Sequence, residues 1–396
     1  MEFQLSEEQR LFQQSVREML ERYKPRRKEY IELMHKEKRF PSELWREFAH
    51  LGLTGCLIPE SYGGNEAGLL SLVLGVEEIA RAGFSPGLLL LTAMDTACLV
   101  RNGSEALKAR ILPRVASGEL KLCWALTEPN AGSNAFAIET TARKEGGSYI
   151  LRGQKVFITG VDLADYILLV ARTTSVEELK RQGMPKVHGL SLFLVEAQAP
   201  GLEKRVLPTR GIEGMHQYHL FLDDVSVPED HLVGEPDAGS FAMFNSLNPE
   251  RIIAAAIAVG MMEFCLEVAV GYARERKVFR STPIGAYQAI SHPLARVKIQ
   301  AEALRLLTYK AAWCYDQGHD PAEVGRYANM AKYFAAEAVV EAVDRGIQTL
   351  GGYGFSEEYE IIYLWEGARL FRTAPVSQEM ILNFMAEHVL GLPRSY

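Results

Sequence analysis

Residues 126–134 read Leu-Thr-Glu-Pro-Asn-Ala-Gly-Ser-Asn. This stretch places turn-forming residues and hydroxyl groups between two segments of strand-like composition. A glycine such as Gly132 lets the backbone approach a ligand closely, and the hydroxyls of Thr127 and Ser133 can hold phosphate or ring oxygens. By itself the segment also fits an ordinary solvated loop, so its surroundings have to decide between the two interpretations.

The residues around this stretch predict a small antiparallel β domain. Short runs there are rich in β-branched and aromatic residues, and Gly146-Gly147 between two of them predicts a hairpin turn. The predicted strands cover residues 149–158, 166–171, 190–195 and 218–222.

Both flanks of the β domain show helical patterns. Ser6 and Gln9 have the spacing of a capping box, and apolar residues at helical spacing follow them. The longest predicted helices lie around 240–276, 288–316 and 321–350, and would form a bundle. We therefore expect a mostly α-helical protein with a central β domain. Its predicted parts are an N-terminal helical domain (1–121), a middle β domain (122–236) and a C-terminal helical bundle (237–396).

Composition excludes several classes of function. The 396 residues carry a formal net charge of -7, which leaves no basic excess to bind a nucleic acid. No basic start followed by an apolar stretch marks the N-terminus, so we expect a cytoplasmic protein. The longest apolar run, between Arg251 and Glu263, predicts a buried helix rather than a membrane insertion. The five cysteines are scattered without paired spacing, so we expect neither a disulfide framework nor a metal site.

The Thr127 loop and the later Phe157-Ile158-Thr159 resemble the signature of acyl-CoA dehydrogenases, Thr-Glu-Pro-x-Ala-Gly-Ser followed by an aromatic-Ile-Thr element. The resemblance continues almost from end to end, because further family motifs occur in the family's order. They are Pro59-Glu60-Ser61-Tyr62-Gly63-Gly64, Asp224-Val225-Ser226-Val227-Pro228, Glu275-Arg276-Lys277-Val278-Phe279 and Gln348-Thr349-Leu350-Gly351-Gly352.

This resemblance implies an architecture and a chemistry. It implies the same three domains with a four-helix C-terminal bundle, assembled as a homotetramer. It also implies FAD as cofactor, an acyl-CoA substrate and an electron-transferring flavoprotein as redox partner. The activity expected from it is α,β-dehydrogenation of the acyl-CoA thioester.

Site residues follow from the resemblance position by position. For FAD they are Thr127, Gly132, Ser133, Phe157, Thr159, Arg276, Phe279, Gln288, Gln348, Gly352 and Ser377. Within this set Arg276, Phe279, Gln288, Gln348 and Gly352 match positions that reach FAD across a subunit interface. The positions that approach the substrate are Ser133, Asn248 and Arg251.

The sequence also departs from the family pattern. Asn134 replaces a common Asp, Glu213 stands where an Arg is common, and the stretch between Phe279 and Gln288 is one residue longer than usual. Gln288 is therefore a less secure match than Arg276.

The largest departure concerns the catalytic base. Most members use the Glu of a Glu-Gly-Thr motif near the C-terminus, and Trp365-Glu366-Gly367 imitates it. Counting without gaps from Gly351 and Gly352, however, puts Pro375 at the base position. A proline supplies neither a carboxylate nor the backbone N–H that helps to polarise the thioester carbonyl in the family.

An alternative base is available in the sequence. Isovaleryl-CoA and long-chain acyl-CoA dehydrogenases carry theirs in a Glu-Arg pair before an apolar helix, which Glu250-Arg251 matches. Glu250 also fits a plain first-turn residue after Pro249. We predict Glu250 as the base. Three alternatives for the missing N–H stay open: substitution by a neighbour such as that of Val376, weaker stabilisation of the enolate, or changed chemistry.

Two other functions remain compatible with the sequence. One is a related flavoprotein that works as an enoyl-CoA reductase or an oxidase. The other is a catalytically silent member that binds FAD or acyl-CoA, which Pro375 favours.

Overall fold

The computed structural model describes residues 4–279 and 281–394. Its first part is helical, as predicted, and begins with the expected capping box of Ser6 and Gln9. The helices are α1 (Glu7–Tyr23), α2 (Arg27–Ile31), α3 (Ser42–His50), α4 (Gly68–Arg81), α5 (Gly87–Asn102) and α6 (Glu105–Ala116). Nearly every side chain of α4 between Leu69 and Ala80 is buried, because α4 packs against α1 on one side and the C-terminal helices on the other.

The middle part is one sheet with the strand order β6-β7-β3-β2-β4-β5-β8, and β1 pairs with β4. The strands are β1 (Leu122–Ala125), β2 (Thr141–Glu145), β3 (Ser148–Thr159), β4 (Tyr166–Arg172), β5 (Leu190–Glu196), β6 (Leu202–Leu207), β7 (Gln217–Pro228) and β8 (Leu232–Val233), with the short helix α7 (Val176–Arg181) between β4 and β5. Gly146 and Gly147 form the predicted turn, since Glu145 pairs with Ser148.

The sheet differs from the prediction in one respect. It is mixed rather than wholly antiparallel, because β1 and the start of β2 run parallel to β4. The chain leaves β1 through the Thr127 loop and returns to the sheet at β2, so the loop acts as a crossover rather than a hairpin. This connection is what brings the loop beside β3.

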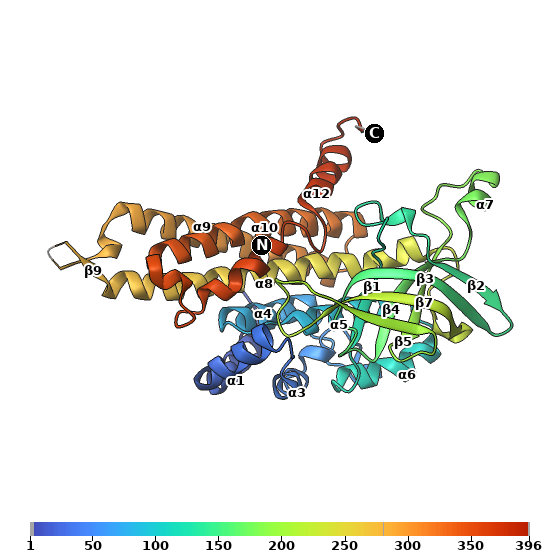
Figure 1. The fold of residues 1–396 in the computed structure, drawn as a ribbon, viewed down its shortest axis with the longest axis horizontal. Helices are drawn as coiled ribbons and strands as arrows, with labels where there is room; N and C mark the ends of the chain where they lie inside the picture. Colours follow the sequence, from blue (N-terminus) through green and yellow to red (C-terminus); the bar gives the residue numbers. More distant parts are fainter. Residues whose placement is uncertain (1–3, 280, 395–396) are drawn as a thin grey trace.

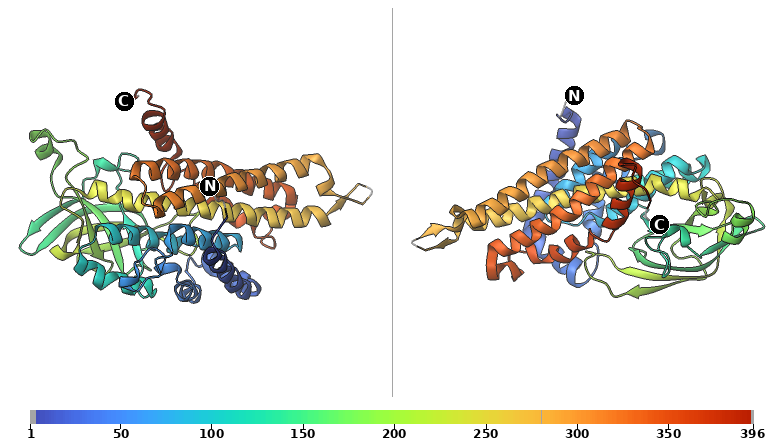
Figure 2. Two further views of the ribbon diagram at one scale, coloured as in Figure 1. Left: turned by 180° about the vertical axis from the view of Figure 1, so that it is seen from behind. Right: turned by 90° about the horizontal axis from the view of Figure 1, so that it is seen from above.

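The C-terminal part contains three long helices close to their predicted positions, α8 (Gly239–Glu275), α9 (Gln288–Asp316) and α10 (Pro321–Leu350). Shorter elements complete it: the β9 (Lys277–Val278) and β10 (Thr282–Pro283) hairpin, α11 (Leu364–Leu370) and α12 (Gln378–Phe384). Figures 1 and 2 show the sheet at one end of the long helices, the N-terminal helices against their side, and α12 projecting from the body.

Helix α8 connects the three parts of the molecule. It packs against α4 and α5 of the first domain, α9 and α10 of the bundle, and β5 of the sheet. By length and composition α8 could cross a membrane, but 78% of its most apolar window is buried inside the molecule. We therefore interpret α8 as the central core helix, as the sequence predicted for residues 251–263.

Candidate active site

A cavity of about 360 Å³ lies where the three domains meet. This volume is in the range of small-molecule sites. Side chains from α5, the sheet, α8 and the segment after α10 line it. They include Leu90, Leu91, Trp124, Thr127, Phe157, Thr159, Glu213, Leu247, Glu250, Ala254, Ile257, Met261, Phe371 and Pro375. The wall is mainly apolar, with two carboxyl groups in it.

Three residues predicted to contact FAD meet at this cavity: Thr127, Phe157 and Thr159. The β3–β7 register shifts between Lys155 and Ile158, and Phe157 within this irregularity has a φ of 59°. The irregularity turns the Phe157 ring out of the sheet, where it is 55% exposed. The Thr159 hydroxyl accepts a hydrogen bond from Gln217 Nε2 at 3.3 Å. An exposed aromatic ring between two hydroxyls fits a flat, polar-edged ring system such as a flavin.

A buried ion pair fixes the Thr127 loop to β3. Lys155 Nζ donates to Glu128 Oε1 at 2.8 Å and to the Leu126 carbonyl at 2.9 Å. The other Glu128 oxygen accepts from the Glu139 N–H at 2.6 Å. Lys155 is fully buried, and burial lowers its pKa to about 8 against the opposing charge of Glu128. Lys155 therefore holds the start of the loop against β3, and Glu128 connects it to the segment that follows the loop.

Glu250 lies on the face of α8 that lines the cavity, one and two turns before Ala254 and Ile257. Its carboxylate accepts no hydrogen bond from any residue that the structure describes. Burial raises the pKa of Glu250 to about 7, although the nearby charges of Arg251 and Lys332 act in the opposite direction. A carboxylate without a protein partner and with a pKa near neutrality is suited to general base catalysis.

Pro375 lines the same cavity as Glu250. A buried lysine on α10, Lys332, holds the segment that carries it: Nζ donates to the Phe371 carbonyl at 2.7 Å and also to the Val376 carbonyl. Within the described chain, the N–H of Val376 has no hydrogen-bond acceptor. The residue after Pro375 thus has a donor that is not used by the protein.

Glu366 has a different environment. Its Oε1 lies 2.7 Å from Arg210 Nε, and its side chain is 39% exposed. The neighbouring Gly367 lines the cavity, but Glu366 does not. Glu366 thus belongs to a surface ion pair.

Glu213 supplies the second carboxyl group of the cavity wall. Burial raises its pKa to about 7, while Arg27 and Lys38 act to lower it. His35 Nε2 lies 3.8 Å from Glu213 Oε2, and burial lowers the pKa of His35 to about 4. Glu213 therefore places an acid in the cavity wall, with the cations Arg27 and Lys38 nearby.

The structure does not bring the other predicted substrate residues to this cavity. Arg251 Nη1 donates to Asn248 Oδ1 at 3.1 Å, and Asn248 Nδ2 donates to the Pro321 carbonyl at 3.3 Å, so both face α10. The Nε of Arg251 is buried and has no partner among the described residues. Gly132 and Ser133 are exposed outside the cavity.

A second group of predicted FAD residues meets elsewhere. Arg276, Gln348 and Gly352 line a surface cavity between the ends of α8 and α10, the ends remote from the sheet in Figure 1. Phe279 nearby is 82% exposed, and Gln288 begins α9 as an exposed residue. Ser377 instead caps α12, with its hydroxyl accepting from the Met380 N–H at 3.4 Å.

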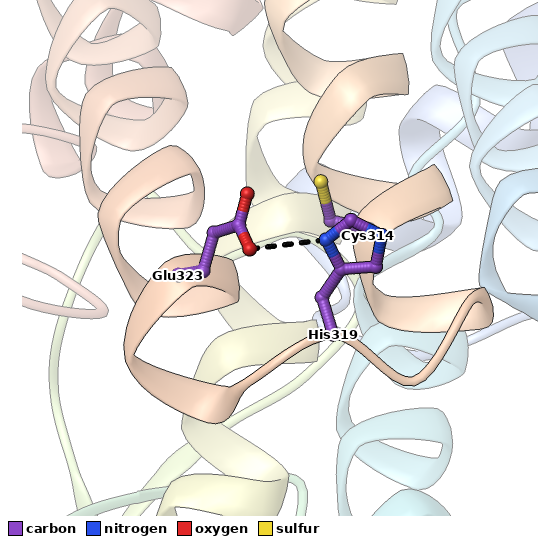
Figure 3. A group of neighbouring side chains, drawn as sticks. All are labelled: Cys314, His319 and Glu323. Carbon is purple, nitrogen blue, oxygen red and sulfur yellow. Dashed lines mark hydrogen bonds and ion pairs between the residues drawn. The ribbon is translucent and has the colours of Figure 1, made fainter.

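One cluster outside these cavities has side chains of metal-binding type. Cys314, His319 and Glu323 place ligand atoms within 4.8 Å of one another at the α9–α10 turn. Figure 3 shows that Glu323 already pairs with His319, at 3.1 Å from Nδ1. All five cysteines are buried free thiols. The expectation that this protein has no metal site stays a prediction.

Sequence comparison with family models matches all three domains. The N-terminal, middle and C-terminal domains of acyl-CoA dehydrogenases match residues 6–119, 123–225 and 237–390. The chain belongs to the acyl-CoA dehydrogenase family. This confirms the family and the fold class that the motifs predicted, and identifies the protein as an enzyme of this type.

Individual relatives agree with this assignment. Acyl-CoA dehydrogenase FadE12 of Mycobacterium tuberculosis is 46% identical over 356 residues, which cover 90% of this chain and 89% of FadE12. A glutaryl-coenzyme A dehydrogenase in complex with glutaryl-CoA superposes with a TM-score of 0.91 at 33% identity, covering 100% and 98% of the two chains. The FAD complex of PigA superposes with a TM-score of 0.89 at 27% identity, covering 99% and 100%. FAD as the predicted cofactor agrees with these structural relatives.

Sequence reasoning missed two residues that shape the site. Lys332 and Lys155 are both fully buried, yet nothing in their local sequence distinguishes them from solvent-exposed lysines. Their only sequence signal is a position within an otherwise apolar helix or strand face. A lysine there needs a buried acceptor, which only the fold reveals.

Proposed function

We propose that this protein removes two hydrogens from the α and β carbons of an acyl-CoA thioester, with FAD as oxidant and Glu250 as base. The observation that carries the proposal is the position of Glu250. Its carboxylate accepts no hydrogen bond from the described residues and shares an apolar cavity with Phe157 and Thr159, two residues that fit a flavin. The base and the oxidant would then reach the same substrate carbons from one cavity.

Bound FAD supplies the acceptor for the hydride that leaves the β carbon. Glu250 takes the proton from the α carbon onto a carboxylate oxygen. Because the pKa of Glu250 is about 7, the carboxylate is available at neutral and alkaline pH and is a stronger base than an exposed one. The apolar residues around it, such as Leu247 and Ala254, keep water away from the acidified carbon.

The thioester carbonyl also needs a hydrogen-bond donor as negative charge develops on its oxygen. Pro375 cannot provide one. The N–H of Val376 is the nearest backbone donor along the chain that has no acceptor in the protein. Lys332 holds the Val376 carbonyl, so the segment is fixed by α10 rather than by the substrate. We infer that Val376 takes over the role of the missing amide.

We further propose a homotetramer. Arg276, Gln348 and Gly352 form a surface cavity at the end of the bundle remote from the sheet, and Phe157 belongs to strand β3 of that sheet. Family positions that contact FAD but lie this far from the flavin site of their own chain are suited to a neighbouring subunit's cofactor. The projecting α12, with Leu382 48% exposed, offers further apolar surface for an assembly.

The redox partner and the compartment belong to the proposal as well. We propose an electron-transferring flavoprotein as acceptor, by family resemblance, and a cytoplasmic location. Reoxidation of the substrate-reduced protein by a purified electron-transferring flavoprotein tests the first, and fractionation of the source cells tests the second.

The deciding experiment mixes the purified protein anaerobically with a panel of acyl-CoA thioesters and follows the flavin absorbance. Bleaching by some thioesters and not others supports the proposal and identifies the substrate class. Bleaching by none, combined with oxidation of the chemically reduced flavin by enoyl-CoA, would point to the reductase. A protein that releases no FAD on denaturation and cannot be reconstituted contradicts the assignment.

A further inference from the structure

Asp95, on α5, is a buried carboxyl group without a function in the site described so far. Its side chain is 0% exposed. Neither carboxylate oxygen has a hydrogen-bond partner within residues 4–279 and 281–394. An isolated buried carboxylate costs many kcal/mol, so such a group keeps its proton or finds a donor. Burial raises the pKa of Asp95 well above its ordinary value.

Helix packing places Asp95 opposite Glu250. Helix α5 crosses α8, and Cys98 Sγ lies 3.5 Å from the Ala242 carbonyl. Cys98 also interacts with the Ser246 side chain. Asp95 is one turn before Cys98 on α5, and Glu250 is one turn after Ser246 on α8, so the two carboxyl groups face each other across the crossing.

Electrostatics agrees with this placement. Burial is the larger cause of the raised pKa of Asp95, and the negative charge of Glu250 raises it further. The neighbours of Asp95 on its own side are two buried thiols, Cys98 and Cys123, whose pKa values are raised by burial.

The charged groups that act on Glu250 from α8 and α10 are two cations, and a third group, Glu379, acts on one of them. The cations are Arg251 on α8 and Lys332 on α10, and Glu379 acts on Lys332. No basic group among the described residues compensates Asp95 directly. Two ionised carboxylates facing each other in this setting are unfavourable, whereas a pair with one proton is favourable.

We propose that Asp95 is a positioning residue for the base: it keeps its proton and donates a hydrogen bond to the Glu250 carboxylate. This inference rests on the proposed function of Glu250. Among the residues that the structure describes, both Asp95 oxygens are without a partner, so the bond forms when one of the two side chains rotates toward the other. The donor stabilises the ionised form of Glu250 despite its burial and orients the second oxygen toward the cavity. The proton stays on Asp95 when Glu250 takes the substrate proton.

The test compares two variants at position 95. Asp95→Asn keeps a donor of the same shape, and Asp95→Leu keeps the branching at Cγ, in a larger side chain, without a donor. The readout is the rate of anaerobic flavin bleaching by a reactive acyl-CoA as a function of pH. A hydrogen bond to a charged group is worth about 1.5–3 kcal/mol, which corresponds to about one to two pH units.

We expect Asp95→Leu to move the limb along which the rate rises with pH upward by about one to two pH units. Because the pKa of Glu250 is about 7, this shift makes the rate at pH 7 roughly fivefold to fiftyfold slower, with recovery at higher pH. In Asp95→Asn the rate should rise with pH over the same range as in the parent protein. A downward shift in Asp95→Asn would mean that Asp95 is an anion, and an unchanged limb in Asp95→Leu would mean that it donates nothing. Either result overturns the proposal.

A second readout does not require substrate or activity. Infrared spectroscopy at a pH where Glu250 is ionised should show the carbonyl stretch of a protonated carboxylic acid in the parent and in Glu250→Gln. The band should be absent in Asp95→Asn. If the parent lacks this band, the proposal fails even if Glu250 is the base. If no acyl-CoA bleaches the parent flavin, the proposed function fails, while the band still decides whether Asp95 holds a proton.

Discussion

The Nζ of Lys332 lies 2.7 Å from the carbonyl oxygen of Phe371, so a buried lysine of the bundle holds one end of the segment that carries Pro375. The same ammonium group also binds the Val376 carbonyl. The segment that carries Pro375 is thus attached to α10, which packs against α8, the helix that carries Glu250. This arrangement links the stability of the cavity wall to the charge of the lysine.

We expect Lys332→Met to destabilise the protein and to shift its pH dependence. Loss of the hydrogen bonds from a charged donor costs about 1.5–3 kcal/mol. Because the positive charge lowers the pKa of Glu250, its removal should raise that pKa and move the rising limb of the activity profile to higher pH. Thermal unfolding and a pH series of flavin bleaching measure the two effects. Lys298→Met, which changes a half-exposed lysine of α9, is the control and should leave the limb in place.

Glu250→Gln should slow flavin reduction by about a hundredfold to ten-thousandfold, because a positioned general base contributes that much. FAD content should not change, since the amide keeps the shape of the side chain. Glu366→Gln should have little effect, because Glu366 pairs with Arg210 at the surface and does not line the cavity. Stopped-flow absorbance with a saturating acyl-CoA measures both. The opposite pattern of rates would show that Glu366 is the base and that the ungapped register is wrong.

Pro375→Glu in the Glu250→Gln background should restore part of the lost rate. Residue 375 lines the same cavity wall as Glu250, and the substitution returns both a carboxylate and a backbone N–H to it. Single-turnover flavin reduction is the measurement, with Pro375→Gln in the same background as the control that returns the N–H alone. Equal rates in the two double variants would argue against a carboxylate acting from position 375.

Lys155→Met should cause a large loss of stability and of bound FAD. It leaves Glu128 buried without its cation, and breaking a buried pair in this way costs about 3–5 kcal/mol. Adding Glu128→Gln should recover part of the loss, because the uncompensated charge is then gone. Thermal unfolding and the ratio of flavin to protein absorbance report the result. Lys144→Met removes an exposed pair with Glu229 and should change neither quantity; a similar effect of both lysines would mean that burial is irrelevant here.

Glu213→Gln should stabilise the protein at alkaline pH. The pKa of Glu213 is raised to about 7 in the folded state, so its favourable contribution is present below its unfolded pKa and is lost as pH rises through 7. At pH 8 the parent holds a buried charge that the amide removes, a difference on the order of 1–3 kcal/mol. At pH 5 the two proteins should unfold at similar denaturant concentrations. If the stability difference between the parent and Glu213→Gln does not vary with pH, Glu213 is not the group that titrates near pH 7.

Local sequence signals predicted most of the elements. The capping box of Ser6 and Gln9, the hairpin at Gly146-Gly147 and the helix from Gln288 to Asp316 all occur as expected. These signals depend on residues that are close in sequence, so they predict the same local structure whatever packs against it. The parallel pairing of β1 with β4 was not predictable in this way, because it joins segments about 40 residues apart through main-chain bonds that carry no side-chain pattern.

The family, the three domains and the residue types available for chemistry could be predicted from the order of the amino acids, and so could the lack of a carboxylate at Pro375. Which of these residues act together became visible in the folded chain. The fold placed Glu250 in the cavity with Phe157, put Glu366 in a surface pair, and set a buried Asp95 across from Glu250. The physical reason is that residue type fixes which proton a side chain can carry, whereas the pKa depends on burial and on charges brought near by distant parts of the chain.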